Sequence, residues 1–213
     1  MIDRIKENLK FELPGIKAWE KMAVRNKGRP KEKLDELNEW AQKKNTGSLK
    51  EAAIILILIK KKNDIVFPLI RRPDNIKNHP GQIALPGGAR EGEEKLKETA
   101  KREAQEEIGI KSEDIKIIGQ LTPIPVPVSG YLVHPFVGTT SKIPEWKLSK
   151  KEVADFFIIK LSRLLDSDND YFEEWNLKGE MVEVPIFKLK GLKIWGATAS
   201  VLSEFIELTK KRG

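Results

Sequence analysis

The sequence contains no cysteine and only two histidines, and both shortages narrow the chemistry open to the chain. Without cysteine it can form no disulfide framework, no thiolate zinc site and no cysteine nucleophile. Long hydrophobic runs are missing as well. The longest apolar stretch, AAIILILI at 52–59, has the length of a strand and is too short to cross a bilayer.

Targeting signals are also missing from the sequence. The N-terminus, MIDRIKENLK, is charged and lacks the apolar core of a signal peptide, and the C-terminus ends in TKKRG, which is no sorting or lipidation signal. The net charge of +7 comes from lysines and arginines that are interspersed with acids, and no RNA-binding aromatic motif is present. We therefore expect a cytoplasmic protein that binds neither membranes nor nucleic acid.

Hydrophobic periodicity predicts one α/β (α+β) domain at 49–213, preceded by an N-terminal helical extension at 1–48. In the extension, Pro30 opens a predicted helix. The domain is predicted to contain strands at 52–59, 65–70, 115–126, 130–140, 181–189 and 192–196, helices at 94–108 and 198–212, and a strand followed by a short helix within 152–166. The two strands at 52–70 should form a hairpin, and 71–82 should be a loop rich in Pro, Asn and Gly.

The predicted helix at 94–108 places acidic residues on its apolar side. On a helical wheel of about 100° per residue, Glu107 falls inside the stripe of Leu96, Ala100, Ala104 and Ile108. Glu103 lies at the edge of this stripe and Glu106 a little further round. Like charges at i, i+3 and i, i+4 repel, and a carboxylate that faces the core is costly unless it is paired. Stability alone does not account for this pattern.

Two kinds of partner could stabilise these carboxylates. Arg102 is adjacent in sequence, but one guanidinium cannot neutralise three acids. Clustered carboxylate oxygens are instead the ligands of a hard cation such as Mg²⁺ or Mn²⁺. The preceding glycine pair, Gly87 and Gly88, lets backbone approach a ligand closely, and its carbonyls and amides could serve a metal or a phosphate. Together the loop and the helix indicate metal-bound phosphate chemistry.

This stretch resembles the signature of the Nudix hydrolases, the Nudix box. The matching residues are Gly88, Glu94, Arg102, Glu103, Ala104, Glu106, Glu107, Gly109 and Ile110. Every fixed position agrees, although Ala104 is smaller than the usual aliphatic residue. The resemblance implies a mixed β-sheet sandwiched between helices, and hydrolysis of a nucleoside diphosphate linked to another moiety.

The resemblance also implies roles for the matching residues. Glu103, Glu106 and Glu107 would hold Mg²⁺ or Mn²⁺, helped by Gly88, while Arg102 would orient Glu103. Glu94 would brace the loop. The general base is not specified by the box: Glu103 is one candidate, and Glu152, which precedes a predicted strand, is another.

The segment PLIRRPDNIKNHPGQIALPGG at 68–88 resembles the additional motif of the coenzyme A pyrophosphatase branch. Leu69, Arg72, Gly81, Pro86, Gly87 and Gly88 match that motif, whereas Pro68, Ile70, Pro73, Lys77 and Leu85 depart from it. The 3′-phosphate of coenzyme A calls for additional cations beside those that hold the pyrophosphate. We therefore expect the substrate to be bound by Arg71, Arg72, Lys77, His79, Gly87 and Gly88.

The sequence thus predicts a coenzyme A diphosphatase that cleaves coenzyme A or its thioesters. Two alternatives stay open: a Nudix hydrolase of ADP-ribose or another nucleoside diphosphate derivative, and a non-catalytic module that binds nucleotides or RNA. The likeness to the coenzyme A branch covers about residues 50–207 and does not explain residues 1–48. Those residues could form a lid or a homodimer contact, and the sequence does not decide between them.

Overall fold

The computed structural model describes residues 1–26, 49–166, 171–177 and 179–210. The predicted helix that begins at Pro30 lies outside these residues. The helical elements are α1 (Ile2–Asn8), α2 (Ile16–Trp19), η1 (Glu20–Met22), α4 (Leu96–Ile108), η3 (Ser112–Asp114), α5 (Leu161–Leu165) and α6 (Gly196–Lys210). The strands are β1 (Arg25–Asn26), β2 (Lys50–Lys61), β3 (Asp64–Arg71), β4 (Ile83–Ala84), β5 (Gly87–Ala89), β6 (Lys116–Gln120), β7 (Ile124–Val126), β8 (Tyr131–Thr140), β9 (Asp155–Lys160), β10 (Tyr171–Leu177), β11 (Glu180–Leu189) and β12 (Leu192–Ile194).

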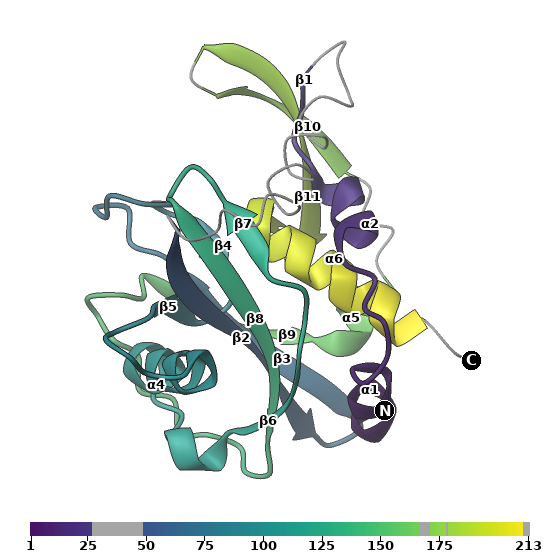
Figure 1. Ribbon diagram of the computed structural model, residues 1–213, viewed down its shortest axis with the longest axis vertical. Helices are drawn as coiled ribbons and strands as arrows, with labels where there is room; N and C mark the ends of the chain where they lie inside the picture. Colours follow the sequence, from purple (N-terminus) through teal and green to yellow (C-terminus); the bar gives the residue numbers. More distant parts are fainter. Residues whose placement is uncertain (27–48, 167–170, 178, 211–213) are drawn as a thin grey trace.

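A mixed sheet centred on β2 forms the body of the molecule (Figure 1). Its strands follow the order β4-β3-β2-β8-β6, with β9 paired to β3, β5 to β2 and β7 to β8. The long pairing of β2 with β8 is parallel, whereas β2 and β3 form the predicted antiparallel hairpin. The predicted mixed sheet is therefore confirmed.

The two faces of β2 serve two separate cores, because successive side chains of a strand point to opposite faces. Ile55 and Ile57 pack in a core with the apolar face of α4. Leu56 and Leu58 pack on the other face, in a core that contains the apolar side chains of α6. The sheet thus lies between α4 and α6, as Figure 1 shows.

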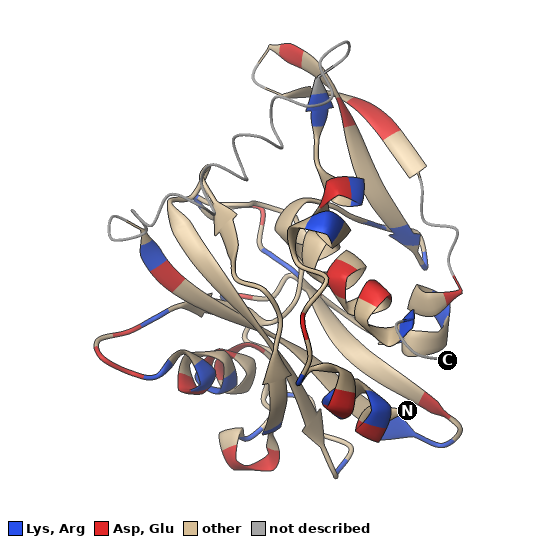
Figure 2. Ribbon diagram, turned by 45° about the vertical axis from the view of Figure 1, so that its right-hand side comes forward, with Lys and Arg blue, Asp and Glu red and all other residues tan. Residues whose placement is uncertain are grey.

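A second, smaller sheet stands beside this body. It joins β1, β11 and β10, with β12 paired to β11. β10 was not predicted: along Tyr171–Leu177 exposed and half-buried residues alternate, with no apolar run to indicate a strand. The charged residues in Figure 2 lie on the helices, the turns and this second sheet, while the central strands carry few.

The N-terminal residues pack onto the C-terminal half of the chain. Helices α1 and α2 both contact α6, and β1 adds to β11 in register, with Arg25 opposite Glu183. The Asn8 side-chain amide donates to the carbonyl of Leu208 at 2.9 Å. The proposed domain boundary at residue 48 stays a prediction.

Candidate active site

The glycine pair forms β5, which pairs with β2 so that Gly87 lies opposite Ile54 and Gly88 opposite Ala53. A Cβ at Gly87 would lie 2.3 Å from the carbonyl oxygen of Ala53, and one at Gly88 would lie 2.5 Å from a carboxylate oxygen of Glu103. Side chains at these two positions would therefore push β5 off the sheet or displace Glu103. The glycines bring the loop backbone directly against the acidic face of α4.

Glu107 is the most buried acid of this face, at 4% exposure. Its Oε2 accepts a hydrogen bond from the Gly87 amide at 2.9 Å, the one hydrogen bond to its side chain within the described residues. Burial raises the pKa of Glu107 to about 8; the Gly87 hydrogen bond opposes this rise and the negative charge of Glu103 adds to it. The helical wheel therefore located Glu107 correctly, inside the buried stripe.

Glu103 contacts Arg102 and lies close to Glu107. Its Oε1 is 3.0 Å from Nη1 of Arg102, and its side chain is 15% exposed. Burial raises the pKa of Glu103, while the neighbouring guanidinium of Arg102 lowers it in part. Glu103 is thus held in position from one side and desolvated on the other.

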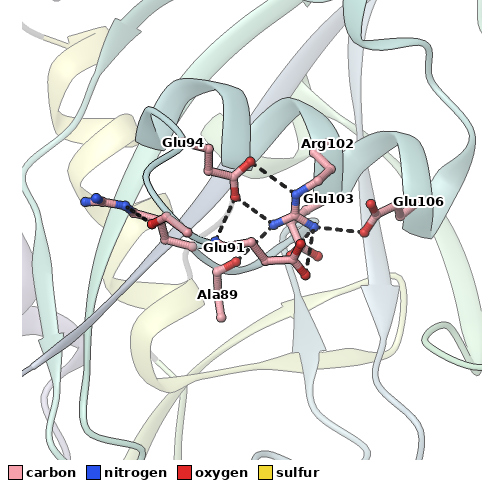
Figure 3. Close-up of polar contacts among 8 residues, drawn as sticks. Ala89, Glu91, Glu94, Arg102, Glu103 and Glu106 are labelled. Atoms are coloured by element: carbon pink, nitrogen blue, oxygen red, sulfur yellow. Dashed lines mark hydrogen bonds and ion pairs between the residues drawn. The ribbon is translucent and has the colours of Figure 1, made fainter.

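Arg102 ties the helix to the loop through four groups, which Figure 3 shows converging on its guanidinium. Its Nη2 donates to Glu94 Oε1 at 2.9 Å and to the Ala89 carbonyl at 3.0 Å, and its Nη1 donates to Glu106 Oε2 at 2.9 Å. The hydrogen bond from Arg102 lowers the pKa of Glu94 to about 2. Glu94 also accepts from the Glu91 amide, so it spans the turn before the helix. These contacts join the loop to the helix, and the predicted bracing and orienting roles stay predictions.

A small cavity of about 190 Å³ opens where the glycine loop meets α4. It is lined by Arg72, Pro73, Ile76, Gly87, Gly88, Ala89, Glu103, Glu107, Lys151 and Glu152. The structure therefore brings Glu152 together with Glu103 and Glu107, although Glu152 lies on the loop before β9. Lys151 was missed by the sequence reasoning, and its place directly before Glu152 was the available signal. Glu106 does not line this cavity and turns to Arg102 instead.

A larger cavity of about 1220 Å³ adjoins the small one and shares with it Arg72 and the three residues of β5. Arg72 stands at the junction, and its buried Nε has no hydrogen-bond partner in the described part of the chain. His79 lines the larger cavity; burial and the charge of Arg72 lower the pKa of its imidazole. The guanidinium of Arg72, whose Nε has no hydrogen-bond partner among the described residues, therefore lies between the small acidic cavity and the larger one.

Two predicted substrate residues lie elsewhere. Arg71 is already paired: its Nε lies 2.6 Å from Asp155 Oδ2 and its Nη1 3.0 Å from Asp74 Oδ2. Lys77 is exposed and lines neither cavity. Their predicted contacts with substrate stay predictions.

The acidic residues suit a hard divalent cation in their chemistry. Among the described residues, no three His, Cys, Asp or Glu side chains already converge as they would around an ion. Glu103 and Glu107 are nevertheless two desolvated carboxyl groups that would repel each other when both are ionised, and a Cβ on Gly88 would fill the space beside Glu103. A cation would relieve their repulsion, and oxygen ligands are those that Mg²⁺ and Mn²⁺ prefer.

Comparison with known proteins identifies the family. The model of the NUDIX domain matches residues 49–178. The chain belongs to the Nudix family. The Nudix hydrolase NudL of Photorhabdus laumondii is 31% identical over 159 residues, which cover 74% of this chain and 84% of that protein. NudL of Yersinia enterocolitica is 33% identical over 151 residues, covering 70% and 77%.

Solved structures confirm the Nudix fold. The Nudix hydrolase RenU of M. smegmatis superposes with a TM-score of 0.54 at 16% identity, covering 77% of this chain and 88% of that one. A MutT/nudix family protein of Enterococcus faecalis gives a TM-score of 0.51 at 14% identity, covering 80% and 66%. Within the described residues, no helix is long and apolar enough to cross a membrane.

Membership of the family defines the reaction in general terms. The chain is a Nudix hydrolase, so it hydrolyses the pyrophosphate bond of a small nucleoside diphosphate derivative. Nudix hydrolases generally use divalent ions such as Mg²⁺ or Mn²⁺. The predicted family and fold are therefore confirmed, while the predicted site residues remain to be tested by mutation.

Proposed function

We propose that this Nudix hydrolase cleaves the pyrophosphate bond of coenzyme A or its thioesters, giving 3′,5′-ADP and 4′-phosphopantetheine or its acyl form. The observation that carries the proposal is the placement of Arg72, an uncommitted guanidinium at the junction of the two cavities. Arg72 belongs to the segment that resembles the coenzyme A motif. That resemblance implies that Arg72 binds a phosphate of the substrate.

Arg72 could bind phosphate because its Nε has no partner among the described residues and its guanidinium presents several donors in one plane. A pyrophosphate placed at the junction would lie between Arg72 and the acidic face of α4. Gly87 and Gly88 would let its oxygens approach the β5 backbone, since no Cβ intervenes. Lys151 would add a second positive charge at the rim of the small cavity.

Glu103 and Glu107, with Glu106 and the Gly88 carbonyl completing the set, would hold Mg²⁺ or Mn²⁺ beside this pyrophosphate. When bound, such an ion neutralises charge on the phosphate oxygens and makes a coordinated water more acidic. Arg102 keeps the Glu103 carboxylate aimed at the loop. Glu103 or Glu152 would accept the proton of the water that attacks phosphorus, while the bridging phosphorus–oxygen bond breaks and the second phosphate leaves.

Product chromatography tests the proposal directly. Coenzyme A, ADP-ribose and a diadenosine polyphosphate are offered side by side with Mg²⁺ or Mn²⁺, and in EDTA. We expect 3′,5′-ADP from coenzyme A, formed much faster than any product of the other two substrates and absent in EDTA. Preferred cleavage of ADP-ribose would overturn the substrate proposal but would leave the family assignment intact. Nucleotide binding without any turnover would favour the non-catalytic alternative.

Arg72 and Arg71 form a matched pair for mutation. Arg72→Gln removes the uncommitted guanidinium, so the KM for coenzyme A should rise by about tenfold or more. Arg71→Gln removes a guanidinium that is already paired with Asp74 and Asp155, and its effect on KM should be several times smaller. Equal effects of the two substitutions would contradict the role given to Arg72.

A further inference from the structure

The larger cavity has a wall that the family model does not cover. The matched range begins at residue 49, but Ile16, Trp19, Glu20, Met22, Ala23 and Val24 all line this cavity. They come from α2, η1 and the link to β1. A segment outside the matched domain range therefore borders the space that adjoins the glycine loop.

This segment is fixed in place by the C-terminal helix. Ser203 Oγ donates to the Ala18 carbonyl at 2.6 Å, and Glu204 accepts from the Gly15 amide at 3.0 Å and from Trp19 Nε1 at 3.4 Å. At its other end the segment continues into β1, which pairs with β11. Figure 1 shows α2 lying against α6 beside this second sheet. The wall is thus held at both ends by side-chain and main-chain hydrogen bonds.

The facing walls of the cavity are largely apolar too. Val126 and Val128 come from β7 and the turn after it, Val182 from β11 and Trp195 from the residue before α6. Val128 is 78% exposed, so an apolar side chain lies at the rim with little of it covered by protein. Arg72 and the glycine loop line the same cavity at its junction with the small one. The cavity therefore combines a cationic junction with a largely apolar lining.

The cavity volume agrees with an extended ligand. At about 1220 Å³ it exceeds the range common for small-molecule pockets, which is about 300–1,000 Å³. A ligand whose pyrophosphate lies at Arg72 would have to extend along the cavity to reach residues 16–24. Apolar surface of this kind stabilises apolar groups and offers little to a sugar or a second nucleotide.

We propose that residues 16–24 determine specificity by binding an apolar group at the end of the substrate remote from its adenosine phosphates. This inference rests on the proposed function, and it names the preferred substrate as a long-chain acyl thioester of coenzyme A. Trp19 and Met22 are buried and form the rigid part of this wall, whereas Ala23 and Val24 are only half-buried. Ala23 has extended backbone, so it tolerates a larger side chain.

Steady-state kinetics with coenzyme A, hexanoyl-CoA and dodecanoyl-CoA test the inference. For the unaltered chain, KM should fall as the acyl group lengthens, by about fourfold for each methylene that becomes buried. Ala23→Phe places a large side chain in the space that the acyl group would occupy. It should therefore raise the KM for dodecanoyl-CoA at least about tenfold more than the KM for coenzyme A. Val24→Ala provides a second variant, which should shift the preference toward a longer chain.

Lys21→Ala is the matched control, because Lys21 lies in the same segment but pairs with Glu207 and lines neither cavity. It should leave the order of the three KM values unchanged. KM values that do not depend on chain length, or an equal effect of Ala23→Phe on all three substrates, would overturn the inference. Cleavage of coenzyme A in the same assay would still support the proposed function.

A binding measurement separates the two failures. Dodecanoyl-pantetheine, which carries no phosphate, is titrated in EDTA, and its binding is measured by titration calorimetry. If no coenzyme A ester is cleaved, the proposed function fails; binding that Ala23→Phe weakens and Lys21→Ala does not would still support the apolar wall. Absence of binding would overturn the inference about the wall as well.

Discussion

Two buried glutamates lie on the two helices that cover opposite faces of the sheet, and they accept very different numbers of hydrogen bonds. Glu204 on α6 is fully buried, and its carboxylate accepts hydrogen bonds from the Gly15 amide, Trp19 Nε1, and both the amide and the hydroxyl of Thr122. Glu107 on α4 is 4% exposed and accepts one, from Gly87. The same side chain at similar burial thus has many donors in one place and few in the other.

The difference separates a structural carboxylate from the one to which we assign metal binding. A buried carboxylate with several donors has exchanged its water for fixed hydrogen bonds, and it links the segments that supply them. A buried carboxylate with one donor keeps most of its desolvation cost, which shows as the raised pKa of Glu107. Only the second has capacity left for a cation. Burial alone would not have distinguished the two.

Glu107→Gln should have the largest effect on activity. The amide keeps the size of the side chain and can still accept from Gly87, but it removes a charge that we assign to metal binding. We expect kcat to fall by about 10²–10³-fold, as when a group that stabilises transition-state charge is lost. Activity with Mg²⁺ and thermal unfolding in EDTA are measured together.

The fold should survive this substitution, because the amide keeps the size of the side chain and can still accept the Gly87 hydrogen bond. Glu98→Gln is the control: it lies on the same helix, and its side chain is 49% exposed, near Lys101. Its activity should match that of the unaltered chain. Mg²⁺-dependent turnover close to normal in Glu107→Gln would show that Glu107 is not a metal ligand.

Glu204→Gln should show the opposite pattern, with loss of stability as its main effect. The amide would present two N–H donors where the carboxylate faced donors, so at least one hydrogen bond of Thr122, Trp19 or Gly15 is lost. Denaturant unfolding should report a loss of about 3 kcal/mol. Glu207→Gln on the same helix removes the charge of a carboxylate in an exposed ion pair with Lys21 and should cost less than about 1 kcal/mol.

Of these two glutamates, only Glu107 could be predicted from the sequence to be unusual. Helical periodicity over 94–108 located Glu107 on the buried stripe, because the stripe, the glutamate and the glycine loop lie within about twenty residues of one another. The strands of the hairpin at 52–70 were predicted for the same reason, since their apolar runs are continuous. Local patterns therefore sufficed to predict the glycine loop and α4.

Glu204 could not be recognised in this way, because its donors are distant in sequence. Thr122 lies 82 positions away and Gly15 lies 189 positions away. The same limit hid the wall of the larger cavity, which assembles α2, the turn after β7 and the strand β11. β10 was missed because it is an edge strand in which acidic and amide residues interrupt the apolar ones, so no continuous apolar run marks it. Each of these features depends on tertiary contacts that no local period reports.

A smaller effect is expected from Arg102→Lys, which tests how Glu103 is held. Lysine keeps the charge but cannot donate in one plane to Glu94, Glu106 and the Ala89 carbonyl at once. We expect kcat to fall by about tenfold, the low end for residues that orient metal ligands, while the KM for substrate changes little. Lys101→Arg next to it makes the reverse exchange on the outer face and should leave kcat unchanged. A loss equal to that of Glu107→Gln would mean that Arg102 contacts substrate itself.

The smallest signal is the proton that Mg²⁺ should displace from Glu107. In the metal-free protein, burial places the pKa of Glu107 at about 8, above the ordinary value of 4.5. The folded state therefore holds a proton that the unfolded state has lost between these values, so its stability should fall as pH rises through this window. Mg²⁺ requires the ionised carboxylate, so binding at pH 7 should release about one proton per ion, and at pH 9 almost none.

Titration calorimetry in two buffers of different ionisation enthalpy measures this difference, with Glu98→Gln as control. Equal proton release at both pH values would mean that Glu107 is already ionised at neutral pH, and the contrast with Glu204 would then lie in hydrogen bonding alone.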